Sequence, residues 1–276
     1  KQKQHDSLDT YHYMLYTKFV ARTDTLTAGR SSGNSDTTII VIFESYSQGW
    51  FAAPDKYFNE ITQRRQSANV QPQTNLVAFG TNINAYDDYV TILGEEIATP
   101  FHKDALDFYD FSIEREYRNE AGSTIVRIAL HPNGNRKLFI GTIDIDKTKL
   151  IPVSVHLQPN KAVQLPFEAA LWYTQLFEQF DNKFVMPTGL RIESSMEADI
   201  LWVLSPRLDI QVETVAYDYT FNMPVDNELF EQRRVEVSET AAILDTSFWY
   251  NNTVLPLRPE EQQAYTDIRN LKENPD

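Results

Sequence analysis

Residues 124–222 constrain the fold more than any other stretch, because apolar and polar side chains alternate along segments that short polar connections separate. In residues 150–158 the apolar positions are Ile151, Val153, Val155 and Leu157, and the polar positions between them are Ser154, His156 and Gln158. This period of two indicates a half-buried strand. Residues 125–130 and 138–145 precede it, and each connection has hairpin length. The three segments predict an antiparallel meander.

Longer strands are predicted downstream, at residues 167–180, 184–203 and 208–221. In the last of these the apolar phase shifts after Thr214, which predicts a bulge or a sharp bend. A strand of this length would extend about 45 Å if it were flat, so strong coiling is expected. We therefore predict a mainly β fold, with a long-stranded antiparallel curved sheet (a half-barrel) and two or three short helices on one side.

The remaining elements follow from local patterns. Residues 11–20, 39–46 and 109–118 have the β-branched and aromatic content of strands. Helices are predicted at residues 54–65 and 100–108, the first because Pro54 precedes Tyr57, Phe58 and Ile61 at helical spacing. Pro259 and the acidic residues after it predict a further helix at residues 258–271. Residues 1–246 are predicted to form the curved sheet domain, and residues 247–276 to pack on it or to lead to a following barrel.

Composition narrows the function classes. The chain has 276 residues, of which 42% are apolar, so it can bury a large core. Its net charge of -14 argues against binding to nucleic acid or to an anionic lipid surface by general attraction. The absence of cysteine excludes disulfides, thiolate metal sites and a cysteine nucleophile. No apolar run approaches the roughly 20 residues that span a bilayer.

Motifs for cofactors and metals are missing from the sequence, so we expect neither. The five histidines are scattered, and a charge group at a helix start explains His102, Asp104 and Asp107 better than a metal site does. The glycines form no phosphate-binding loop, and no serine lies in a nucleophile elbow.

Two acidic pairs, Glu95-Glu96 and Asp87-Asp88, leave a hydrolase acting on glycans as an alternative function. Adjacent residues on a strand point to opposite faces, so neither pair forms a facing acid and base by itself. The sequence therefore identifies no catalytic residue.

Neighbouring aromatic residues in the long strands are the more informative feature. Where two are adjacent, as in Trp172-Tyr173, one ring faces away from the layer that its neighbour packs on. Such a ring needs a covering helix, a partner or a ligand. Core packing explains most of the aromatic residues, and a ligand-lining role is predicted for Trp172, Tyr173, Met196, Ala198 and Trp202.

The C-terminal segment carries a spaced motif: Ser247-Phe248-Trp249, Leu255-Pro256-Leu257, Glu260-Glu261, Tyr265 and Asp267. It resembles a signature of an uncharacterised family of Bacteroidetes outer-membrane proteins, domain of unknown function 5686. The family pattern has Arg, Pro and Thr where this chain has Thr253, Val254 and Arg258. Residues 13–18, 104–114 and 139–145 are also similar to segments of that family.

The resemblance implies a periplasmic part of a longer protein, which a carboxypeptidase-regulatory-like domain precedes and an outer-membrane barrel follows. It also implies a half-barrel like that of periplasmic lipoprotein carriers, which hold acyl chains between sheet and helices. We therefore expect a non-enzymatic periplasmic domain, associated with the outer membrane, that binds an apolar ligand such as a lipid or acyl chain, or a partner protein. The glycan hydrolase remains the alternative.

Overall fold

The computed structural model describes residues 8–24, 37–54, 56–67, 84–165, 169–197, 207–231, 235–241 and 246–273. Internal contacts divide the chain into two compact units. The middle unit comprises Asn82–Ser194 together with Lys1–Leu8, and the flanking unit comprises Asp9–Thr81 together with Ser195–Asp276. The predicted division into residues 1–246 and 247–276 stays a prediction. The predicted mainly β fold, a large, curved and open antiparallel sheet with few helices, is confirmed.

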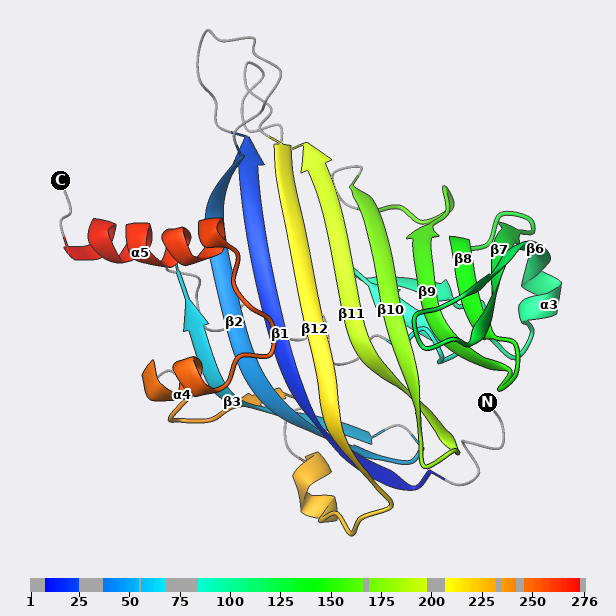
Figure 1. Ribbon diagram of the computed structural model, residues 1–276, viewed down its shortest axis with the longest axis horizontal. Coiled ribbons are helices and arrows are strands. Elements are labelled where there is room, and N and C mark those ends of the chain that lie inside the picture. The colour runs from blue at the N-terminus through cyan, green and yellow to red at the C-terminus, as the bar shows by residue number, and fades with distance from the viewer. Residues whose placement is uncertain are drawn as a thin grey trace, which may run out of the picture. The chain divides into compact units, whose positions relative to one another are not determined.

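In the middle unit, strands follow one another in the order β11-β10-β9-β8-β7-β6 (Figure 1). Their bounds are β6 Tyr109–Arg118, β7 Thr124–Pro132, β8 Phe139–Asp146, β9 Ile151–Pro159, β10 Ala170–Phe180 and β11 Phe184–Glu197. The hairpins β6-β7, β7-β8, β8-β9 and β9-β10 are antiparallel. This is the meander that the alternation predicts. In β9, Val155 and Leu157 are buried and His156 is exposed, as expected.

One face of the middle unit is packed by its own chain. Residues 84–108, which include β4 Tyr89–Ile92, β5 Glu95–Ala98 and α3 Ala105–Phe108, supply side chains to this core. The buried Gln175 side chain accepts a hydrogen bond from the Ala85 backbone N–H at 2.7 Å. The Tyr109 hydroxyl donates to the Ala98 carbonyl and accepts from the Phe139 N–H, at 2.8 and 3.0 Å. These buried bonds join the covering segment to the sheet.

The flanking unit has the strand order β13-β3-β2-β1-β12. Its elements are β1 Thr10–Asp24, β2 Thr37–Ala52, β3 Lys56–Gln66, β12 Arg207–Phe221, η3 Asn227–Glu231, β13 Val235–Val237, α4 Thr246–Asn251 and α5 Pro259–Glu273. The strands β1, β2 and β12 are long and curve along their length (Figure 1). No helix within the described ranges is both long and apolar enough to cross a membrane.

The helix predicted at residues 54–65 is wrong, because this segment forms the strand β3. It pairs antiparallel with β2, and Tyr57 and Phe58 lie opposite Phe51 and Trp50. The facing rings are 4.9 and 5.5 Å apart between centroids. Cross-strand aromatic pairs stabilise a sheet, and the long strand β2 needs a hydrogen-bonding neighbour, so tertiary pairing outweighs the helical spacing.

Two other local predictions need adjustment, and one hairpin was missed. The helix predicted at residues 100–108 is present only as the short α3, and the hairpin of β4 and β5 was not predicted. The bulge predicted after Thr214 lies further along β12: the pairing with β1 is regular from Thr214 to Tyr217 and slips between Tyr217 and Thr220. Asp218, between these two residues, has φ of 53°, which breaks the alternation there.

A close approach of two strands makes Gly141 a sensitive position. It has φ of 134°, and a Cβ atom there would lie 2.1 Å from the His156 carbonyl oxygen on β9. We expect Gly141→Ala to destabilise the protein by about 2–4 kcal/mol, through backbone strain and overpacking together. Gly134→Ala is the control, because it also has positive φ but open space around it, and its cost should be about 1 kcal/mol. Equal losses in chemical denaturation would contradict the close approach.

Candidate functional site

The C-terminal strap, defined as residues 246–273, packs on one face of β1 and β2 (Figure 1). Trp249 of α4 lies in a cluster with Tyr16 and Tyr46. Ala264 of α5 lies in a second cluster with Val20 and Ile42. Leu257 packs against the second cluster, and the helix predicted at residues 258–271 is confirmed as α5, Pro259–Glu273.

The start of α5 is held by a capping interaction and by buried charges. The Glu261 carboxylate accepts from the Arg258 backbone N–H at 3.0 Å, the reciprocal contact of a capping box. The same carboxylate is within 3.2 Å of Lys18 and 3.4 Å of Arg22 on β1. Lys18 also pairs with Glu213 on β12 at 3.0 Å. Two cations thus balance two carboxylates, and the strap is joined to two strands.

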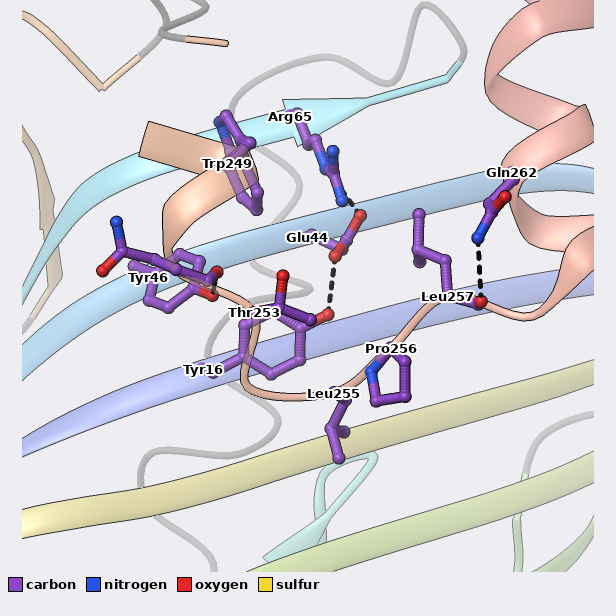
Figure 2. Close-up of a pocket in the computed structure, with 11 residues that line it drawn as sticks. Tyr16, Glu44, Tyr46, Arg65, Trp249, Thr253, Leu255, Pro256, Leu257 and Gln262 are labelled. Atoms are coloured by element: carbon purple, nitrogen blue, oxygen red, sulfur yellow. Dashed lines mark hydrogen bonds and ion pairs between the residues drawn. The ribbon is translucent and has the colours of Figure 1, made fainter. Parts of the chain in front are cut away.

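A second buried carboxylate, Glu44 on β2, accepts hydrogen bonds from three side chains. Tyr16 on β1 donates at 2.6 Å, the Arg65 Nε on β3 at 2.7 Å, and Tyr265 on α5 at 2.8 Å. Figure 2 shows Tyr16, Glu44 and Arg65 meeting over three neighbouring strands. The guanidinium carbon of Arg65 also lies 4.3 Å from the Trp249 ring centre and 5.0 Å from that of Tyr265. The cluster therefore connects three strands to both helices of the strap.

Burial and the negative charge of Glu44 determine the protonation states of Tyr16, Tyr265 and Arg65. Burial first, and then the negative charge of Glu44, raise the pKa of Tyr16 and of Tyr265, so both phenols stay protonated donors. Burial lowers the pKa of Arg65, but its hydrogen bond with Glu44 and the charge of Glu44 outweigh burial and leave that pKa raised. Arg65 is therefore cationic, and it pairs with the carboxylate.

A pocket of about 280 Å³ lies between the strap and these strands (Figure 2). The strap contributes its loop, with Leu255, Pro256 and Leu257, together with the Trp249 ring. The strands contribute Tyr16, Tyr46 and the Glu44-Arg65 pair. The remaining lining residues are Asn252, Thr253 and Gln262. Apolar walls with a few convergent polar groups are typical of small-molecule sites.

Several polar groups of the pocket are already used within the protein. The Tyr46 hydroxyl donates to the Asn252 carbonyl, and the Gln262 side-chain amide donates to the Leu257 carbonyl at 3.2 Å. Glu44 is surrounded by its three donors. What the pocket offers to a ligand is consequently mainly apolar surface.

The predicted ligand residues lie elsewhere. On β10, Trp172 is half-exposed and stacks on His156, with ring centres 4.8 Å apart, whereas Tyr173 is fully buried on the opposite face. The Tyr173 hydroxyl donates to the Gln175 side chain at 2.7 Å. Met196 is partly buried near the end of β11, and Ala198 and Trp202 lie outside the described residues. The ligand role of these five residues stays a prediction.

The strand residues of the pocket were not singled out from the sequence. A signal exists for one of them: Glu44, like Lys18 outside the pocket, is a single charge inside an otherwise apolar and aromatic strand segment. A charge at such a position is expected to be paired when it is buried. The strap residues Trp249, Leu255 and Leu257 belong to the C-terminal motif, although the motif alone does not indicate a pocket.

The acidic residues considered for hydrolysis are distributed over the covering segment of the middle unit. Glu95 on β5 pairs with Lys137 at 2.6 Å, and Glu96 is exposed. Asp87 and Asp88 precede β4. Across the described ranges, no three His, Cys, Asp or Glu side chains are placed to hold a metal ion.

Adjacent residues of α4 allow a matched test of strap packing. Trp249 is 7% exposed and Tyr250 is 86% exposed. We expect Trp249→Ala to lower the free energy of unfolding by about 3–5 kcal/mol, because it removes a large buried ring. Tyr250→Ala should change it by no more than about 0.5 kcal/mol. If the two variants unfold alike in denaturant, the strap is not packed as described.

The Glu44 cluster makes a second prediction. Glu44→Ala removes the acceptor of three donors and leaves the partly buried Arg65 without its partner, which should cost about 3–5 kcal/mol. The control is Asp209→Asn, which breaks the exposed pair of Asp209 with Arg207 in the same unit and should cost at most about 1 kcal/mol. Chemical denaturation measures both, and a Glu44→Ala loss as small as that of the control would exclude the proposed anchoring role.

The chain was compared with curated proteins and with solved structures. No curated protein matches it. One solved structure similar to the chain is a DUF1329 family protein from Desulfovibrio piger, with 9% identity and a TM-score of 0.34, over 83% of this chain and 92% of that one. Another is lipovitellin, with 9% identity and a TM-score of 0.37, over 94% of this chain and 33% of that one.

The family match is more extensive. Residues 1–201 match the family of unknown function DUF5686. The matched part includes β1, β2 and β3, which carry Tyr16, Glu44 and Arg65, whereas the C-terminal strap lies beyond it. Because the match covers well over half of the sequence, the chain belongs to the DUF5686 family.

Proposed function

We propose that this chain is a non-enzymatic binding domain that takes an apolar or amphipathic molecule into the pocket beneath the C-terminal strap. The observation that carries the proposal is the pocket itself, about 280 Å³ between aromatic strand residues and the loop with Leu255, Pro256 and Leu257. A ligand there gains about 0.8 kcal/mol for each methylene that it buries.

The buried carboxylates of the flanking unit favour binding over hydrolysis. Glu44 has three hydrogen-bond donors, and Glu261 has two cations and a backbone N–H. A general acid or base must exchange its proton with a substrate, and a carboxylate enclosed in this way instead fixes the position of its neighbours. The two groups therefore act as anchors of the strap in our proposal.

The cellular setting is proposed from the family resemblance. The motif of the strap resembles that of outer-membrane proteins of Bacteroidetes, which supports a periplasmic domain beside the outer membrane. In that setting the natural ligand would be a lipid or an acyl chain, with an outer-membrane barrel of the same protein as the neighbour of the strap.

Binding can be tested with a hydrophobic fluorescent probe. We expect saturable binding with a dissociation constant on the order of micromolar. It should change little between low and high salt, because burial rather than charge provides the affinity.

Two tryptophan substitutions locate the probe. Leu255→Trp replaces an aliphatic side chain in the wall of the pocket by a larger indole ring and should weaken binding by about tenfold or more. Tyr250→Trp changes an exposed residue of α4 that does not line the pocket, and binding should be retained. Absence of saturable binding to the unmodified protein, or equal binding to the two variants, would refute the proposed site.

A further inference from the structure

The charged residues that line the pocket support an inference about the chemistry of its ligand. This inference rests on the proposed function. Of the residues that line the pocket, Glu44 and Arg65 are charged, and they form a pair at 2.7 Å. Their formal charges cancel. A ligand in the pocket therefore meets apolar walls, a few neutral polar groups and one internally neutralised ion pair.

Arg65 retains hydrogen-bonding capacity in this arrangement. Its Nε donates to Glu44, and the Tyr265 side chain is also hydrogen-bonded to the guanidinium, so these two partners take only part of its donor capacity. Its side chain is 25% exposed, and the guanidinium lies beside the rings of Trp249 and Tyr265. A guanidinium has five N–H groups, so the terminal nitrogens can donate to a ligand while Nε stays bonded to Glu44.

An anionic ligand is disfavoured at this place. A carboxylate bound to Arg65 would share that cation with Glu44, and two like charges around one partner oppose each other. The positive end of the α5 dipole does not supply the missing attraction, because Glu260 and Glu261 already occupy its first turn. A cationic ligand would instead be repelled by Arg65.

We infer that the pocket selects a neutral acyl compound, such as an ester or amide, whose carbonyl oxygen accepts a hydrogen bond from the terminal nitrogens of Arg65. The acyl chain lies against Leu255, Pro256 and Leu257, and the carbonyl lies at the Glu44-Arg65 pair. Arg65 is thus the residue that determines specificity, and Glu44 determines that the ligand is uncharged.

The test compares three compounds of one chain length: an alkane, the fatty acid and its methyl ester. Each displaces the fluorescent probe at a pH where the acid is ionised. The ester should bind about tenfold more tightly than either of the other two. Equal affinity for acid and ester would overturn the inference and leave the proposed function standing. Failure of all three compounds to displace the probe would overturn the proposed function.

A charge substitution reverses the expected preference. Glu44→Gln removes the competing negative charge and leaves Arg65 positive, so affinity for the ionised acid, measured relative to affinity for the alkane in the same variant, should rise by about tenfold. Asp209→Asn removes a carboxylate outside the pocket and should leave all three affinities unchanged. A folded Glu44→Gln protein that gains no affinity for the acid would contradict the role of Glu44. Should this variant fail to fold, the acid-to-ester ratio of the unmodified protein still decides the inference.

Discussion

The buried carboxylate of Glu44 is the interaction on which the rest of the flanking unit depends. An ionised group inside a protein is costly unless hydrogen bonds and an opposite charge compensate it. Here the compensation comes from Tyr16 on β1, Arg65 on β3 and Tyr265 on α5, so one side chain on β2 requires two neighbouring strands and the last helix to be in place. Glu261 imposes the same requirement from the helix side, because its partners Lys18 and Arg22 both lie on β1.

The pocket is a consequence of this anchoring. Trp249 of α4 and Ala264 of α5 pack on the strands, and the loop between the two helices crosses the strands with Leu255, Pro256 and Leu257. The loop has fixed ends but incomplete contact with the sheet, which leaves a space of about 280 Å³. The same ion pair that holds the strap also lies in the pocket lining, so structural anchoring and ligand selection share residues in our account.

Much of the fold was predictable from the sequence, because strand alternation is a local property. The meander of β7, β8 and β9, the strand β6 and the helix α5 follow from their own residues. The strand β3 did not, because its partner β2 determines its conformation and helical spacing at Tyr57, Phe58 and Ile61 is only a local preference. The site was harder to predict from the sequence than the strands were. Tyr16, Glu44 and Tyr265 are far apart in sequence, and their meeting depends on the order β3-β2-β1, which alternation does not encode. The motif around Trp249 contains four of the eleven residues that line the pocket, but it does not indicate what they pack against.

The central claim, that a neutral acyl ligand binds beneath the strap, is tested most directly by fluorine NMR of protein labelled with 5-fluorotryptophan. The chain has Trp50, Trp172, Trp202 and Trp249, and each resonance can be assigned from a single Trp→Phe variant. Titration with a fatty-acid methyl ester should shift the Trp249 resonance saturably, because that ring lines the pocket, and should leave the Trp172 resonance in place. A shift of Trp172 with no change at Trp249 would place the ligand on β10 and contradict the account.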